Sequence, residues 1–118
     1  MKNTPENIDL LKDIDDRMMY ANYGLEWDEV GDILKVHVTT RAPLWQDIPE
    51  IKFYDATDAG GGFLILIDGP ERTVDRSIES AKSIARDWQR AAEVAEIIKC
   101  RLIYAGYDWD RYADCNLA

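Results

Sequence analysis

The feature that most constrains the fold is a short turn within the segment LEWDEVGDILKVHV, residues 25–38. Apolar and polar residues alternate on both sides of Gly31-Asp32, and a period of two is typical of a β-strand with one buried face. A two-residue loop that contains glycine favours a β-hairpin, because glycine readily adopts the positive φ that such turns require. The segment therefore predicts an antiparallel hairpin over residues 25–38.

The length of the loop also sets the pairing of the two strands. Counting back from the turn, Trp27 falls opposite Val36, whereas Glu26 and Asp28 lie on the other face. We therefore expect one face of the hairpin to be apolar and to pack on the domain, with Trp27 buried there. The opposite face is expected to pair Asp28 with Lys35 and Glu26 with His37.

The N-terminal segment predicts a helix. Thr4 fits the N-cap position and Pro5 the first helical position, where a proline has no hydrogen bond to lose. Leu11, Ile14 and Met18 recur at helical spacing, so this side of the helix is expected to pack on the core.

The rest of the chain predicts two more strands and a long helix. Strands are expected near residues 50–56 and 62–68. Helical spacing continues over about residues 73–105 and ends at Gly106, and a helix of ~50 Å is expected to bend or break near residues 90–93. The order of elements and the length of 118 residues predict a single α+β domain, residues 1–118, with a four-stranded antiparallel sheet and the long helix packed on one sheet face.

The charge of the chain restricts its partners. The net charge is −9, and residues 1–68 carry fourteen acidic side chains against six basic ones. Such a surface repels phosphate groups, so direct binding to nucleic acid or to an anionic membrane is disfavoured and a positively charged protein is the expected partner. The longest apolar run, residues 63–67, is too short to span a membrane, so a cytoplasmic protein is expected.

Motifs for catalysis, cofactors or metals are lacking in the sequence. Gly60, Gly61 and Gly62 open a predicted strand rather than a helix, so they do not form a phosphate-binding loop. His37 is the only histidine, and the two cysteines lack the spacing of a metal site. We therefore expect a non-enzymatic protein without a cofactor or a metal ion.

Three acidic segments are the candidate partner-binding regions. The third, residues 107–118, also holds aromatic side chains of the kind that dominate the binding energy of protein interfaces. Trp109 is expected at the binding surface, because burying it would desolvate a neighbouring carboxylate, whereas Tyr104 is expected to pack within the fold. The candidate residues are Asp9, Asp13 and Asp16 in the first helix, Glu26, Asp28, Glu29 and Asp32 in the hairpin, and Asp108, Trp109, Asp110 and Tyr112 in the tail.

In size, acidity and lack of catalytic motifs the chain is similar to small inhibitors encoded by phages and mobile elements, such as anti-CRISPR and antirestriction proteins. This resemblance is one of composition, and it implies an inhibitor that occupies the basic nucleic-acid-binding surface of a host protein. Two alternatives remain at this point. The first is an adaptor or structural subunit, homodimeric through the long helix, and the second is a small enzyme whose site carries no familiar motif.

Overall fold

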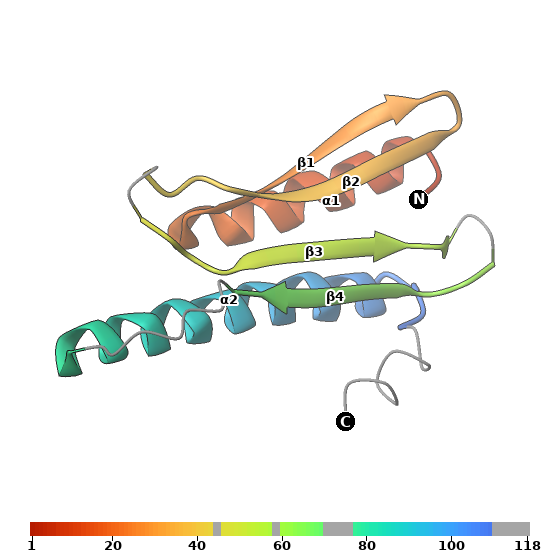
Figure 1. Cartoon of the computed structure of the whole chain (residues 1–118). Helices are drawn as coiled ribbons and strands as arrows, with labels where there is room; N and C mark the ends of the chain where they lie inside the picture. Colours follow the sequence, from red (N-terminus) through yellow and green to blue (C-terminus); the bar gives the residue numbers. More distant parts are fainter. Residues whose placement is uncertain (44–45, 58–59, 70–76, 110–118) are drawn as a thin grey trace.

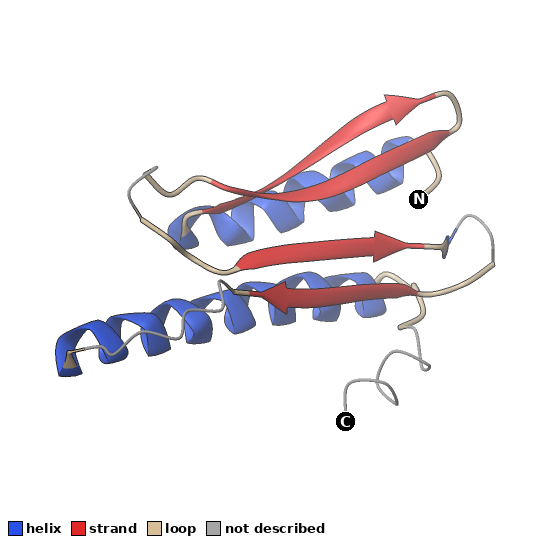
Figure 2. Ribbon diagram, viewed as in Figure 1, coloured by secondary structure: helices blue, strands red, loops and turns tan. Residues whose placement is uncertain are grey.

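The computed structural model describes residues 1–43, 46–57, 60–69 and 77–109. The chain has an α+β fold, as predicted, in which the strands form one layer and the two helices cover one side of it (Figures 1 and 2). The elements are α1 (Pro5–Met18), the short 3₁₀ helix η1 (Met19–Ala21), β1 (Tyr23–Val30), β2 (Ile33–Thr40), β3 (Glu50–Asp55), β4 (Phe63–Asp68) and α2 (Ile78–Tyr104).

The predicted hairpin is confirmed in both extent and register. Strands β1 and β2 pair in antiparallel fashion, Val30 pairs with Ile33 next to the turn, and Trp27 pairs with Val36. Gly31 has a φ of 59°, so the first residue of the two-residue loop adopts the backbone conformation that glycine tolerates best. Trp27 is half-buried and packs against the core rather than being fully enclosed.

The prediction of one four-stranded sheet is wrong in its hydrogen bonding, because the strands form two separate two-stranded sheets, β1–β2 and β3–β4. The four strands follow one another in a single layer, and the N-terminus lies between β2 and β3 (Figure 1). Lys2 bridges to Ile33, and the Leu34 amide donates to the Met1 carbonyl at 2.8 Å. The first residues of the chain therefore occupy part of the β2 edge that would otherwise pair with β3.

The two helices lie beside each other and run antiparallel. Tyr107, just after α2, donates a hydrogen bond to Asn7 at the start of α1. Arg90, in the middle of α2, donates to the carbonyl of Tyr20, just after α1. Helix α2 runs from Ile78 to Tyr104 without the break that its length led us to expect, and Gly106 ends it with a φ of 98°.

The core lies between the helices and the strands. The predicted inner face of α1 is confirmed, since Leu11, Ile14 and Met18 are buried. Helix α2 buries a stripe of four residues, Ala91, Val94, Ile98 and Leu102. These side chains enclose the inner faces of both hairpins in one contiguous apolar cluster.

The end of β3 is joined to the N-terminus by a partly buried ion pair. The Asp55 carboxylate accepts a hydrogen bond from the Met1 ammonium group at 2.5 Å and another from the Thr57 amide at 2.9 Å. Burial by itself raises the pKa of Asp55, but these hydrogen bonds and the ammonium charge outweigh it and hold the pKa below its ordinary value.

Acid should therefore weaken the fold through Asp55. A carboxylate with a depressed pKa contributes stability above its unfolded pKa of about 3.9, and this contribution is lost as the pH falls through the lower folded value. We expect the free energy of unfolding, measured with urea between pH 6 and pH 3, to fall more steeply for the wild type than for Asp55→Asn. Parallel pH profiles of the two proteins would show that the ion pair adds nothing.

Candidate acidic interface

The hairpin β1–β2 presents four of the predicted partner-binding carboxylates on one continuous segment. Glu26, Asp28, Glu29 and Asp32 are all exposed, and together they are called the acidic hairpin here. Glu26 and Asp28 alternate with the inward-facing Leu25 and Trp27, so they point away from the helices. The register of the hairpin thus places Glu26 and Asp28 on the outer face. Glu29, which pairs with Leu34, and Asp32 in the turn are exposed near the end of the hairpin.

Two exposed aliphatic side chains lie among these carboxylates. Val30 is 50% exposed and Ile33 is 40% exposed, and the two form the pair next to the turn. An apolar centre with a charged rim is the usual composition of a protein-binding patch. The chemistry available at this surface is therefore contact with an apolar side chain and ion pairing with surrounding cations.

Internal pairing neutralises little of the acidic hairpin. The Asp28 carboxylate lies 3.1 Å from Nε2 of His37, and both side chains are largely exposed. Within the described parts of the chain, Glu26, Glu29 and Asp32 form no ion pair. Three of the four carboxylates therefore remain available to cations of a partner.

The carboxylates of α1 lie on the opposite side of the molecule. Asp9 and Asp16 are exposed on the side of α1 that is turned away from the core. Asp13 forms ion pairs within the chain, because its carboxylate lies 3.1 Å from Arg17 and 3.0 Å from Arg101. The hydrogen bond from Arg17, reinforced by both guanidinium charges, lowers the pKa of Asp13 although partial burial opposes this. The fold therefore does not gather the first two acidic segments onto one face.

Asp15 has a structural role that the sequence pattern did not reveal. Its carboxylate accepts a hydrogen bond from the Leu25 amide at 2.8 Å and another from Arg41 at 3.3 Å. A Cβ atom at Gly24 would overlap the Arg41 side chain, so glycine at this position leaves room for the contact. Asp15 thus links α1 to the start of β1 through this hydrogen bond.

The positions of two aromatic residues near the C-terminal end are the reverse of those predicted. Tyr104 is 83% exposed, whereas Trp109 packs edge-on against Phe63 with ring centroids 5.2 Å apart. The Phe63 amide donates to the Asp108 carbonyl at 2.9 Å, which places this segment in extended form beside β4. Successive side chains of an extended segment point to opposite sides, so Trp109 is half-buried while the Asp108 carboxylate stays exposed.

Trp109 is therefore packed within the fold, contrary to the prediction. The indole packs without burying the Asp108 carboxylate, because the two side chains point to opposite sides of the segment. Lys99 lies 4.2 Å from the centre of the indole and covers it further. Asp110 and Tyr112 lie outside the described residues, and the role of the tail in binding stays a prediction.

A pair of substitutions tests this assignment. Trp109→Ala should lower the free energy of unfolding by about 1.5–3 kcal/mol, because it removes a large contact with Phe63. Tyr104→Ala should change it by less than about 0.5 kcal/mol, because the ring is mostly in water. Urea denaturation of both variants provides the measurement, and equal stabilities of the two would contradict the packing of Trp109.

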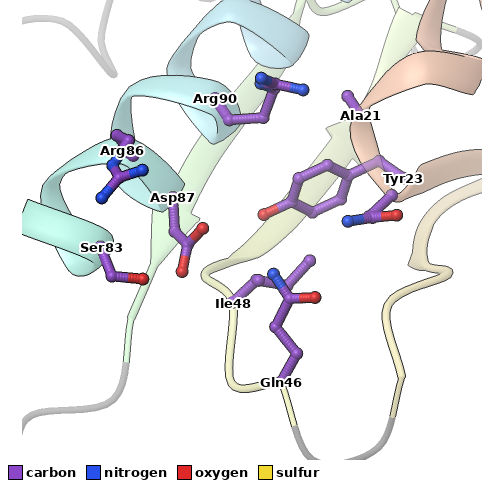
Figure 3. A pocket seen from close by; sticks show the side chains of 9 residues that line it. Ala21, Tyr23, Gln46, Ile48, Ser83, Arg86, Asp87 and Arg90 are labelled. Atoms are coloured by element: carbon purple, nitrogen blue, oxygen red, sulfur yellow. The ribbon is translucent and has the colours of Figure 1, made fainter. Parts of the chain in front are cut away.

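A separate pocket holds convergent polar side chains (Figure 3). This polar pocket has a volume of about 250 Å³ and lies between α2, the start of β1 and residues 46–48. Tyr23 forms one wall, and its buried hydroxyl group donates to the Pro49 carbonyl at 2.5 Å. Burial, and to a lesser extent the charge of Asp87, raises the pKa of Tyr23 to about 12. The hydroxyl group therefore keeps its proton at neutral pH.

Other features of the structure limit the range of activities. Within the described residues, no group of three or more His, Cys, Asp or Glu side chains is placed to hold a metal ion. No helix in the same parts of the chain combines the length and the apolar character needed to cross a membrane. Comparisons with models of known protein families, with curated proteins and with solved structures found no match.

Proposed function

We propose that this protein is a small acidic inhibitor of the anti-CRISPR or antirestriction type. The acidic hairpin binds a basic surface on a nucleic-acid-binding protein and excludes the nucleic acid from it. The observation that carries the proposal is that one hairpin exposes four carboxylates together with the Val30–Ile33 pair, with Glu26 and Asp28 on its outer face and Glu29 and Asp32 next to its turn. A single basic side chain, Lys35, lies within the two strands beside them, so the net charge of the hairpin is strongly negative.

The shape of this surface supports the same proposal. A two-stranded β-ribbon is narrow enough to fit the major groove of DNA, so it also fits a protein groove that is wide enough for a nucleic acid. Strands β1 and β2 form such a ribbon, with its turn at Gly31. Carboxylates on the ribbon replace phosphates as partners of Lys and Arg, while the aliphatic pair adds apolar burial that a nucleic acid does not offer. Exposed charges also speed the encounter of oppositely charged proteins.

Two variants with the same change in net charge distinguish the contribution of the acidic hairpin to binding from that of the overall negative charge. Each variant removes four exposed carboxylates. The hairpin variant carries Glu26→Gln, Asp28→Asn, Glu29→Gln and Asp32→Asn. The helix-layer variant, its matched control, carries Asp9→Asn, Asp16→Asn, Glu93→Gln and Glu96→Gln.

The test has two stages. The wild type and both variants are first used to capture proteins from a lysate of the natural host, after nuclease treatment. The captured protein is then purified, and its binding to labelled DNA or RNA is measured while the inhibitor is added. We expect the wild type and the helix-layer variant to capture one basic protein and to displace its nucleic acid, and the hairpin variant to do neither. Equal capture by all three proteins, or a stable ternary complex with nucleic acid, would refute the proposal.

A structural subunit that forms homodimers is the second candidate. An open groove of about 790 Å³ runs between α1 and α2, with Ala92 and Ile97 in its lining. Arg17 and Glu93 both belong to its lining, so a two-fold contact between two copies of this groove brings side chains of both charges together. This candidate predicts a dimer in sedimentation experiments that Ala92→Arg dissociates, whereas the inhibitor proposal needs only a monomer.

A further inference from the structure

The polar pocket offers hydrogen-bond acceptors at one end. Ser83 and Asp87 lie one turn apart on α2, and their side chains point toward the Tyr23 hydroxyl group (Figure 3). Among the described residues Asp87 forms no ion pair, although its charge acts on the Tyr23 hydroxyl group. The Tyr23 hydroxyl proton is given to the Pro49 carbonyl, so the hydroxyl oxygen can only accept from a ligand. An uncompensated carboxylate beside acceptor oxygens favours a ligand group with several donors and a positive charge, such as an ammonium group.

The other end of the pocket offers cationic donors. The Arg90 side chain extends toward Ala21, away from Asp87 (Figure 3). It is held there because Nη1 donates to the Tyr20 carbonyl at 3.4 Å and the guanidinium group lies 5.4 Å from the centre of the Tyr20 ring. A guanidinium group has five N–H donors, so Arg90 keeps donors for a carboxylate. Arg86 also lines the pocket, but its Nε donates to the Lys82 carbonyl at 3.4 Å, so its charge lies on the side of Ser83 and not beside Arg90 (Figure 3).

The size of the pocket limits the ligand. A volume of about 250 Å³ lies below the range of about 300–1,000 Å³ that is typical of sites for drug-sized molecules and cofactors. We propose that the polar pocket binds a free α-amino acid, with the ammonium group on Asp87 and the Tyr23 oxygen and the carboxylate on Arg90. The Gln46 amide, which also points into the pocket, is placed to contact the side chain of the ligand. This site is independent of the acidic hairpin, and the proposal does not rest on the proposed function.

The experiment uses the full chain and free L-amino acids with side chains no larger than that of glutamate, each at about 10 mM, a range suited to weak ligands. Binding is followed through the backbone amide NMR signals. We expect at least one amino acid to shift the signals of Tyr23, Gln46 and Asp87 in a saturable manner and to leave those of the acidic hairpin unchanged. The N-acetyl derivative and the amide of the same amino acid should each bind at least tenfold more weakly, because each lacks one of the two charges.

Substitutions provide the second line of evidence. Asp87→Asn should weaken binding of that amino acid at least tenfold, whereas Glu96→Gln, on the same helix but outside the pocket, should not change it. The blocked derivatives test the proposal on the unmodified protein, so the outcome does not depend on the folding of a variant. The proposal is overturned if no amino acid shifts the pocket signals, if the N-acetyl derivative binds equally well, or if inorganic phosphate competes as strongly as the amino acid.

Discussion

Phe63→Ala should lower the free energy of unfolding by about 3–5 kcal/mol, the usual range for removing a fully buried phenylalanine. The Phe63 ring is 1% exposed, stacks on Phe53 at 6.1 Å and receives the edge of Trp109. It therefore joins β3, β4 and the segment after α2. A loss of this size is a large part of the 5–15 kcal/mol that is typical of a small domain.

Tyr54→Ala is the matched control, because Tyr54 belongs to the same two-stranded sheet but is exposed. It should cost less than about 1 kcal/mol, as surface substitutions usually do. Chemical denaturation of the two variants gives both values. A loss below about 1 kcal/mol for Phe63→Ala would mean that the packing around this ring is not as described.

The hairpin variant should associate with the captured partner at least tenfold more slowly than the wild type at low salt. The four carboxylates attract the partner over a Debye length of about 10 Å at 0.1 M salt, and the amides that replace them do not. The helix-layer variant carries the same net charge, so a slowing of less than about threefold is expected for it. Stopped-flow measurements at several salt concentrations should show that the difference between the variants shrinks as the salt rises. Equal slowing of both variants would mean that only the net charge matters.

The elements of this fold could be predicted where a local signal decides them. The Gly31 turn determines the register of β1 and β2, and Thr4 and Gly106 mark the start of α1 and the end of α2. The separation of the strands into two sheets could not be foreseen, because it depends on Met1 meeting Leu34 across the fold. Helical spacing alone also does not show where the buried stripe of α2 begins, since Ile78 at its start is 71% exposed whereas Ala91 is buried.

Part of the candidate site could also be predicted from the sequence, whereas contacts between distant residues could not. The alternation of residues in β1 correctly placed Glu26 and Asp28 on an outer face. The i, i+4 spacing of Asp13 and Arg17 indicates one partner of Asp13. Its second partner, Arg101, is distant in sequence, so no spacing rule reveals that contact. The polar pocket was missed for a similar reason, because Tyr23, Gln46 and Asp87 come together only in the folded chain.

The most direct test of the central claim is amide hydrogen exchange of this protein, free and bound to its captured partner. We expect residues 28–34, around the turn between β1 and β2, to exchange at least tenfold more slowly in the complex. Exchange in the exposed parts of α1 and α2 should be unchanged. Protection confined to the helices, with unchanged exchange at the turn, would contradict the claim that the acidic hairpin is the binding surface.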